Sequence, residues 1–158
     1  IVRGAHPWID IHRHEGSAEK PATLSTINDL KKQGYQIAVT SLREGCVSLD
    51  EFVPTKPTCV VFGTEETGVS DEVHDAADVY LQIPMYGFTQ SFNVSVTCAM
   101  ILRDLTLKIR QHDMAWPLSE LEKEELRFDW YCKTLNCSED LLKRFFEDLE
   151  DLEDVKQD

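Results

Sequence analysis

Short apolar runs alternate with stretches of helical periodicity along the first two thirds of the chain. Four runs have the length and pattern of strands: residues 8–12, 35–40, 58–62 and 79–83. The run at 58–62 is continuously apolar, which is typical of a strand covered on both faces. Helical spacing predicts three helices: one after Pro21 that is capped near Gly34, a short one that starts at Ser70, and a long one from about Phe92 to His112. This order predicts an α/β fold with a mostly parallel sheet and flanking helices.

The pattern changes after Pro117. Ser119 and Glu122 have the spacing of a capping box and predict a helix that runs to about Leu135. A second helix is expected from Ser138, and its apolar residues form one stripe: Leu141, Leu142, Phe145, Phe146, Leu149 and Leu152. Either this stripe packs inside the protein while acidic residues face solvent, or it binds a partner or a second copy of the chain. We therefore expect a domain over 1–116 and an acidic helical extension over 117–158.

Composition and charge narrow the class of protein. The 158 residues include 16 Lys and Arg against 29 Asp and Glu, a net charge of −13, and 42% are hydrophobic, as in a globular domain. This acid excess argues against nonspecific binding to polyphosphate, which requires basic side chains. Its distribution is uneven, because residues 119–158 hold 14 acidic and 6 basic residues whereas 1–118 hold 15 and 10. No apolar run approaches the about 20 residues of a membrane span, so we expect no membrane partner.

The cysteines and histidines give no pattern of a metal site. There are five cysteines, Cys46, Cys59, Cys98, Cys132 and Cys137, and none forms a pair at zinc spacing. Their odd number indicates reduced thiols in the cytoplasm or nucleus, and an organelle stays open if a transit peptide has been removed. His12 and His14 would share one face of a strand, but no third ligand stands at a fitting distance along the chain. We therefore expect no metal.

The stretch 62–103 carries the candidate chemistry. A strand ends near Gly63 and a glycine-bearing loop follows, which is where α/β sheets bind ligands. Gly63 and Gly68 have the spacing of a phosphate-binding loop, but that loop requires Lys-Ser/Thr where Val-Ser stands here, so a P-loop is excluded. Gly-x-Ser-x-Gly is absent, so a hydrolase nucleophile has no support. Ser91 and Asn93 open the long helix, and ordinary N-capping accounts for either residue taken alone.

Taken together, these segments resemble the SpoU-type branch of the SPOUT RNA methyltransferases. The family's strand followed by Gly-x-Glu-x-x-Gly stands here as 63–68 (GTEETG), and its Ile-Pro-Met-x-Gly-x-x-x-Ser-Leu-Asn-Val-Ser-Val stands as 83–96, with Phe92 in place of Leu. The start at Gly4-Ala5, the Thr40-Ser41-Leu42 strand end and Pro57 are similar to the subgroup that methylates the ribose of a tRNA guanosine. The resemblance covers about residues 4–110.

The resemblance implies a fold, a cofactor and a set of site residues. The fold would include a deep trefoil knot near the C-terminal end of the domain, and the cofactor would be S-adenosylmethionine. Six residues would line the cofactor site: Thr40, Leu42, Gly63, Ile83, Met85 and Phe92. Three would face the reacting ribose: Glu65, Ser91 and Asn93. The family's activity is methyl transfer to a ribose 2′-hydroxyl of tRNA or rRNA, and its members work as homodimers.

One family motif is missing. Members of the family carry an Asn and an Arg on an earlier helix, where the Arg helps to deprotonate the 2′-hydroxyl, and no residue of this sequence matches that motif. Because the chain begins with Ile1 rather than Met, we expect it to be the C-terminal portion of a longer enzyme, weakly active or inactive by itself. The alternative is a catalytically inactive scaffold of the same fold that binds RNA or protein.

Overall fold

The computed structural model describes residues 8–16, 22–89, 91–112, 116–135 and 138–154. The chain divides into two compact units, each treated by itself below. Residues Arg13–Trp116 form one, and the described residues of Ile1–His12 and Pro117–Asp158 form the other. The first unit contains the whole sheet and the segments that carry the candidate chemistry.

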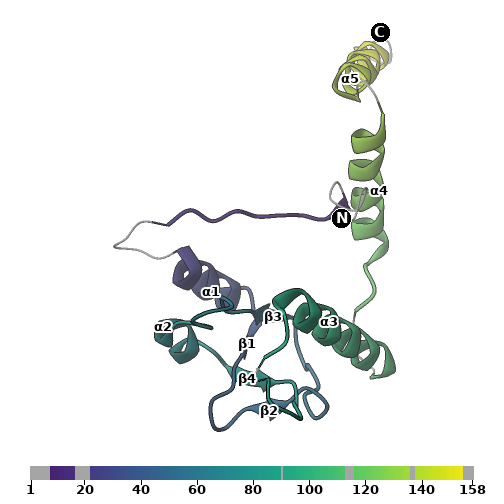
Figure 1. Ribbon diagram of the computed structural model, residues 1–158. Helices are drawn as coiled ribbons and strands as arrows, with labels where there is room; N and C mark the ends of the chain where they lie inside the picture. Colours follow the sequence, from purple (N-terminus) through teal and green to yellow (C-terminus); the bar gives the residue numbers. More distant parts are fainter. Residues whose placement is uncertain (1–7, 17–21, 90, 113–115, 136–137, 155–158) are drawn as a thin grey trace. The chain divides into compact units, whose positions relative to one another are not determined.

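Four parallel strands form the sheet of the first unit: β1 (Gln36–Thr40), β2 (Val47–Ser48), β3 (Thr58–Val61) and β4 (Val79–Gln82). Their order across the sheet is β2-β4-β1-β3 (Figure 1). The central strand β1 pairs with β3 on one side and β4 on the other, so Ala38 lies opposite both Val60 and Val79. The predicted parallel sheet and three of its strands are confirmed, whereas β2 was not predicted because two residues carry no periodicity.

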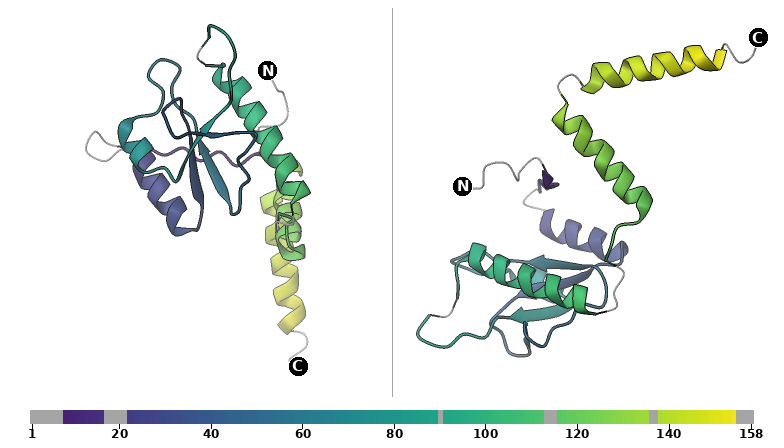
Figure 2. Two further views of the ribbon diagram at one scale, coloured as in Figure 1. Left: turned by 90° about the horizontal axis from the view of Figure 1, so that it is seen from below. Right: turned by 90° about the vertical axis from the view of Figure 1, so that its right-hand side faces the viewer.

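Helices cover both faces of this sheet (Figure 2). On one face, α1 (Ala22–Lys32) and α2 (Asp71–Asp75) pack on β1 through a buried cluster: Ile27, Ile37, Val39 and Val73. On the other face, α3 (Val94–Gln111) packs on β4 and the segment after β2 through a second cluster: Leu49, Phe52, Leu81, Ile101 and Leu105. Alternate strand residues thus supply two separate cores, as the pleat of a doubly covered sheet requires.

The predicted helix ends are confirmed in most details. Gly34 has a positive φ of 88°, and the N–H of Tyr35 donates to the carbonyl of Leu30 at 3.0 Å, so a glycine ends α1 in the way expected. Ser70 precedes α2 as its N-cap residue, but its side chain makes no capping hydrogen bond. The long helix α3 begins at Val94 rather than at Phe92 because Asn93 is its cap.

Asp78 connects three elements at the amino ends of β1 and β4, whereas the candidate site is at the carboxyl ends of the strands. Its carboxylate accepts from the backbone N–H of Ile37 at 2.8 Å and from Lys31 Nζ at 2.9 Å, and its own N–H donates to the Ile37 carbonyl at 2.9 Å. Burial alone would raise the pKa of Asp78, but the hydrogen bonds from Ile37 and Lys31 lower it overall. One carboxylate therefore links α1, β1 and β4.

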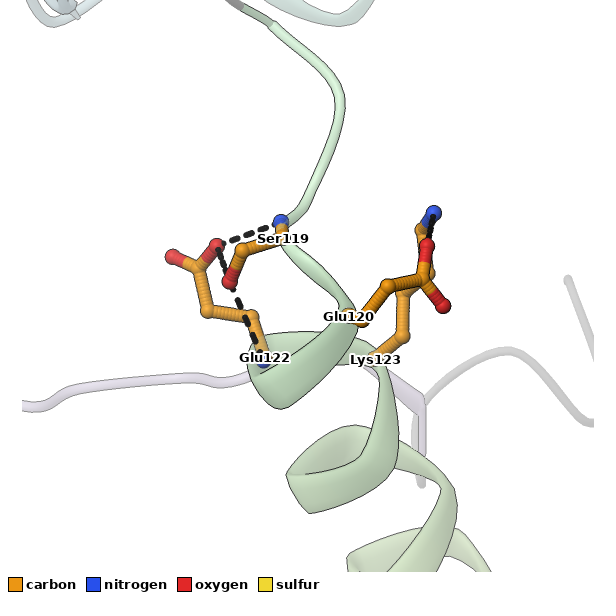
Figure 3. A network of polar contacts seen from close by, with 4 residues as sticks. All are labelled: Ser119, Glu120, Glu122 and Lys123. Carbon is orange, nitrogen blue, oxygen red and sulfur yellow. Dashed lines mark hydrogen bonds and ion pairs between the residues drawn. The ribbon is translucent and has the colours of Figure 1, made fainter.

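The second unit contains α4 (Glu120–Thr134) and α5 (Ser138–Asp154). The predicted capping box is present at the start of α4 (Figure 3). The Glu122 N–H donates to Ser119 Oγ at 3.2 Å, and the Ser119 N–H donates to Glu122 Oε2 at 2.7 Å. Hydrogen bonds from the Ser119 side chain and backbone lower the pKa of the Glu122 carboxyl. The sequence change at Pro117 therefore coincides with the start of a locally well-specified helix.

The strand predicted over 8–12 is wrong. This segment belongs to no strand, and its apolar side chains are exposed, with Ile9 at 58% and Ile11 at 54%. Trp8 lies edge-on to Trp130 of α4, with ring centroids 5.6 Å apart. Alternation predicts a strand only where a neighbouring strand accepts its hydrogen bonds, and among the described residues none pairs with this segment.

Packing of the α5 stripe inside the protein is also wrong for three of the four stripe residues whose side chains are described, and the fourth, Leu142, is partly buried. Leu141, Phe145 and Phe146 are between 49% and 58% exposed, whereas Leu149 and Leu152 lie outside those residues. A one-sided apolar pattern is buried only when an apolar surface faces it. Helix α4 presents exposed aromatic side chains of its own, among them Phe128 and Tyr131, so the two helices do not bury each other.

Candidate functional site

A pocket of about 530 Å³ lies at the carboxyl ends of β1, β3 and β4. Such a volume is in the range of sites for drug-sized molecules, and strand ends are where parallel sheets bind ligands. The structure brings eight of the nine predicted site residues to this pocket: Thr40, Leu42, Gly63, Glu65, Ile83, Met85, Ser91 and Phe92. They come from three loops that are distant in sequence, and the parallel topology makes these loops neighbours.

The loop after β3 closes tightly on itself, and its glycines explain the Gly-x-Glu-x-x-Gly spacing. Thr64 and Gly68 exchange two backbone hydrogen bonds, of 2.9 and 3.1 Å. A Cβ on Gly63 would lie 2.2 Å from the carbonyl carbon of Gly68, so no side chain fits there. Gly68 itself has φ 68°, a conformation that favours glycine. The two glycines hold a short loop in which Glu65 is an exposed residue at the pocket.

The apolar part of the pocket comes from the segment after β4. Ile83 and Met85 are partly buried, and Phe92 is 42% exposed. On the β1 side, Thr40 donates its hydroxyl to the Val61 carbonyl at 3.2 Å, which ties the ends of β1 and β3 together, whereas Leu42 is 58% exposed. These apolar side chains form one part of the lining, as is usual in sites that bind small organic molecules.

Asn93 is the predicted site residue that does not line the pocket. Its Oδ1 accepts from the Ser95 N–H at 2.9 Å, and its carbonyl accepts from the Thr97 N–H at 2.9 Å and from the Thr97 hydroxyl at 3.1 Å. These contacts make Asn93 the N-cap of α3, as ordinary capping predicts. Ser91, two residues earlier, is exposed and does reach the pocket.

Outside the two sequence motifs, two charged or titratable residues line the pocket, and neither was predicted. Arg43 lines the pocket and forms an ion pair with Asp71 at the start of α2, and the hydrogen bond and charge of Arg43 lower the pKa of the Asp71 carboxyl. His74 also lines the pocket and is only 4% exposed, so burial lowers the pKa of its imidazole. Its Nδ1 is buried without a hydrogen-bond partner. Neither residue belongs to a motif, so only their tertiary positions identify them.

The described residues give little sign of other kinds of site. No group of three or more His, Cys, Asp or Glu side chains among them is placed to hold a metal ion. None of the helices in the described ranges is long and apolar enough to cross a membrane. The thiols of Cys46, Cys59, Cys98 and Cys132 are free, and Cys137 lies outside the described residues. The pocket at the strand ends is therefore the site to interpret.

Comparison with known proteins gives consistent relatives. The chain is 37% identical over 131 residues to a tRNA (guanosine(18)-2′-O)-methyltransferase of Borreliella burgdorferi, covering 83% of this chain and 57% of that protein. The enzyme of the same name from Escherichia coli is 34% identical over 133 residues, covering 80% of this chain and 54% of that protein. The chain thus spans little more than half the length of the curated relatives it matches.

Solved structures agree in fold. The TrmH/SpoU tRNA modifying enzyme of A. aeolicus superposes with a TM-score of 0.70 at 34% identity, covering 85% of this chain and 66% of that chain. The SpoU methyltransferase AviRb from Streptomyces viridochromogenes, in complex with the cofactor AdoMet, shares the fold alone, with a TM-score of 0.51 at 21% identity over 59% of this chain and 38% of that chain. The model of the SpoU rRNA Methylase family matches residues 2–103, which include the sheet and the pocket-lining residues described above. The chain belongs to the SpoU rRNA methylase family.

Proposed function

We propose that this chain is the cofactor-binding portion of an enzyme that transfers a methyl group from S-adenosylmethionine to a ribose 2′-hydroxyl of tRNA. The observation that carries the proposal is the convergence of two separate sequence motifs, 63–68 and 83–96, on one pocket at the carboxyl ends of parallel strands. Relatives that match most of this chain bear the name of tRNA (guanosine(18)-2′-O)-methyltransferases, which favours tRNA over rRNA as the substrate.

The pocket residues fit the proposed cofactor. The partly buried Ile83 and Met85 and the ring of Phe92 offer apolar contacts for an adenine base, and Gly63, where no side chain fits, brings the backbone of its loop to the pocket wall. When bound, S-adenosylmethionine supplies an electrophilic methyl group on a sulfonium. Thr40 and Leu42 would close the site from the end of β1.

The residues at the pocket margin would orient the ribose. Glu65 and Ser91 are exposed at the pocket and can accept and donate hydrogen bonds to a ribose and its neighbours. Asn93 would act from the N-cap position that precedes α3, where the hydrogen bond from the Ser95 N–H holds its amide in one orientation. Displacement at a methyl carbon needs the attacking hydroxyl to be aligned and to lose its proton in the transition state. Alignment is what this set of side chains supplies.

The knot and the homodimer belong to the same proposal. β4 lies between β1 and β2 in the sheet although it follows both in sequence, and α3 then packs on Leu49 and Phe52 after β2. This position of a late strand between two earlier ones is the observation that supports a trefoil knot. We infer a second copy of the chain as the partner, which light scattering on the purified protein tests directly.

Calorimetry with S-adenosylmethionine tests the core of the proposal. We expect the 158-residue chain to bind it with a Kd on the order of micromolar. Phe92→Ala should weaken binding, whereas Phe88→Ala is the matched control, because Phe88 is fully exposed in the same segment and does not line the pocket. Absence of binding by a folded chain, or equal loss in both variants, would contradict the proposal and favour an inactive scaffold of the same fold.

Methyl transfer itself needs a second measurement. Incorporation of a labelled methyl group into an unmodified tRNA transcript reports the reaction, and analysis of the labelled nucleoside identifies the 2′-O position. Because no residue of this sequence matches the family's Asn and Arg motif, we expect a rate at least about 10²-fold below that of a complete enzyme. Robust turnover by this chain alone would overturn that part of the expectation.

A further inference from the structure

Arg43 occupies a distinct position in the pocket. Of the described residues that line the pocket, it is the one with a permanent positive charge, whereas Glu65 and Glu66 bring negative charge. It lies in the loop that follows β1, two residues after Ser41, whose N–H still donates to the Leu81 carbonyl of β4. Its guanidinium reaches Asp71 at the start of α2, so the ion pair connects two walls of the site.

The ion pair with Asp71 is poorly suited to hold Arg43 permanently. The side chains are 49% and 83% exposed, and ion pairs at such exposure are weak because water and salt screen them. By contrast, Lys108 pairs with Asp104 at 2.6 Å with both side chains mostly buried, and also donates to the carbonyls of Leu49 and Asp50. The contacts of Lys108 therefore stabilise the fold. Arg43, by contrast, is paired with an exposed carboxylate that another anion can replace.

The charge of the protein makes such a replaceable cation important. A polyanionic substrate that approaches a chain of net charge −13 gains electrostatic affinity where basic side chains meet its phosphates. Arginine suits this role because its planar guanidinium binds a phosphate through two parallel hydrogen bonds. Its exposure places the Arg43 guanidinium within reach of a ligand that arrives from solvent rather than one enclosed in the pocket.

We propose that Arg43 is an RNA-binding residue that leaves Asp71 and pairs with a phosphate of the substrate at the mouth of the pocket. The proposal rests on the proposed function and adds to it the group that anchors the RNA backbone next to the cofactor site. In the absence of RNA, Asp71 pairs with the Arg43 guanidinium and thereby limits the binding of other anions at this position. Exchange of one ion pair for another needs no change in the fold.

Binding of an unmodified tRNA transcript by the full chain, measured by fluorescence anisotropy at several KCl concentrations, tests this role. Arg43→Gln should weaken binding about 3- to 10-fold and reduce the slope of log K against log salt by about one. The matched control is Arg103→Gln, which removes the same charge from an exposed position on α3 that does not line the pocket. Arg43→Lys keeps the charge and should keep the salt slope.

Two further measurements distinguish a phosphate contact from a general effect of charge and from a contact with the cofactor. Asp71→Asn should strengthen tRNA binding, whereas Glu72→Gln, the adjacent exposed carboxylate, should have the smaller effect of general charge removal. Calorimetry with S-adenosylmethionine should give a Kd within about twofold of the unaltered chain for Arg43→Gln. That measurement also shows whether the proposed function holds, independently of the role of Arg43.

Four results would overturn the proposal. The first is an unaltered chain that binds no tRNA at the lowest salt, and the second is an Arg43→Gln variant that behaves like Arg103→Gln. The third is a fall in S-adenosylmethionine affinity equal to the fall in tRNA affinity, which would assign Arg43 to the carboxylate of the cofactor. The fourth is an Asp71→Asn variant that binds tRNA no more tightly than Glu72→Gln does.

Discussion

Replacement of Gly63 by alanine tests how strictly the loop after β3 depends on a missing side chain. The new Cβ would lie 2.2 Å from the Gly68 carbonyl carbon, 2.5 Å from the Val69 nitrogen and 2.6 Å from the Gly68 Cα. All three are backbone atoms, so no rotamer change relieves the clash. The loop must open, and opening separates Thr64 from Gly68, which share two hydrogen bonds.

The expected magnitude follows from these contacts. Loss of two backbone hydrogen bonds costs about 1–3 kcal/mol in total, at about 0.5–1.5 each. Overpacking that forces a backbone shift costs about 1–3 kcal/mol. We therefore expect Gly63→Ala to lower the free energy of unfolding by about 2–6 kcal/mol, the lower values applying if the loop opens without further rearrangement. The same backbone shift displaces the pocket wall. We expect it to weaken S-adenosylmethionine binding at least about tenfold, which corresponds to a loss of about 1.4 kcal/mol in binding free energy.

Gly68→Ala is the matched control for this experiment. A Cβ there meets nothing within 4 Å, but φ is 68°, so the cost is that of a left-handed residue, about 1–2 kcal/mol. Urea denaturation followed by circular dichroism gives both free energies of unfolding, and calorimetry gives both affinities. The reasoning is refuted if Gly63→Ala unfolds within about 0.5 kcal/mol of the unaltered chain or if Gly68→Ala is the more damaging change.

Substitutions at three other positions test single side chains. Asn93→Ala should lower the free energy of unfolding by about 1 kcal/mol because the cap on α3 is lost, whereas Asn93→Asp keeps the acceptor, so loss of methyl transfer with unchanged urea stability would assign a separate role to the amide. Asp78→Asn should cost about 1–3 kcal/mol in the same assay, since the carboxylate accepts two hydrogen bonds, and equal stability would contradict its linking role. His74 has a folded-state pKa below its unfolded value of about 6.5, so the unfolded chain binds more protons as the pH falls through that value and stability should decrease from pH 7.5 to 5.5. His74→Leu should reduce this pH dependence, and an identical dependence in both proteins would refute the assignment.

The parts of the fold that were predictable are those whose pattern depends on local environment. The apolar runs at 35–40 and 58–62 indicate strands, and the continuous run at 58–62 indicates a strand that is covered on both faces. Glycine at position 34 and the pair Ser119 and Glu122 mark helix ends through their own backbone contacts. Such features need no knowledge of the remaining chain.

The failures concern features that depend on a distant partner. Residues 8–12 alternate as a strand does, but a strand exists only if another strand pairs with it. The α5 stripe is amphipathic, but its burial depends on which surface faces it. The two residues of β2 become a strand through pairing with β4, more than thirty residues later in the chain. In each case the local pattern is compatible with two outcomes, and tertiary contacts decide between them.

The residues of the candidate site likewise divide into those that a local motif identifies and those that only tertiary contacts identify. Gly63 and the segment 83–92 could be assigned to a pocket because a motif carries them, and the parallel topology then places them together. Arg43 and His74 lie outside both motifs, and Arg43 meets Asp71 across 28 residues of sequence. No spacing rule predicts that contact, because it arises from the packing of α2 beside the end of β1. Residues that set substrate affinity can therefore lie outside the motifs that identify the family.

For RNA affinity, the positions of individual charged side chains matter more than the net charge of the chain. An acid excess of thirteen charges opposes a polyanion over distances of about a Debye length, near 10 Å in ordinary buffers. At the pocket itself, the lining includes one arginine and two glutamates, and Asp71 pairs with that arginine. A phosphate that displaces Asp71 from Arg43 leaves that carboxylate unpaired beside it, so substrate affinity is the difference between two ion pairs. Removal of the Asp71 carboxylate should therefore change RNA affinity in the opposite direction from removal of the arginine, whatever the total charge of the chain.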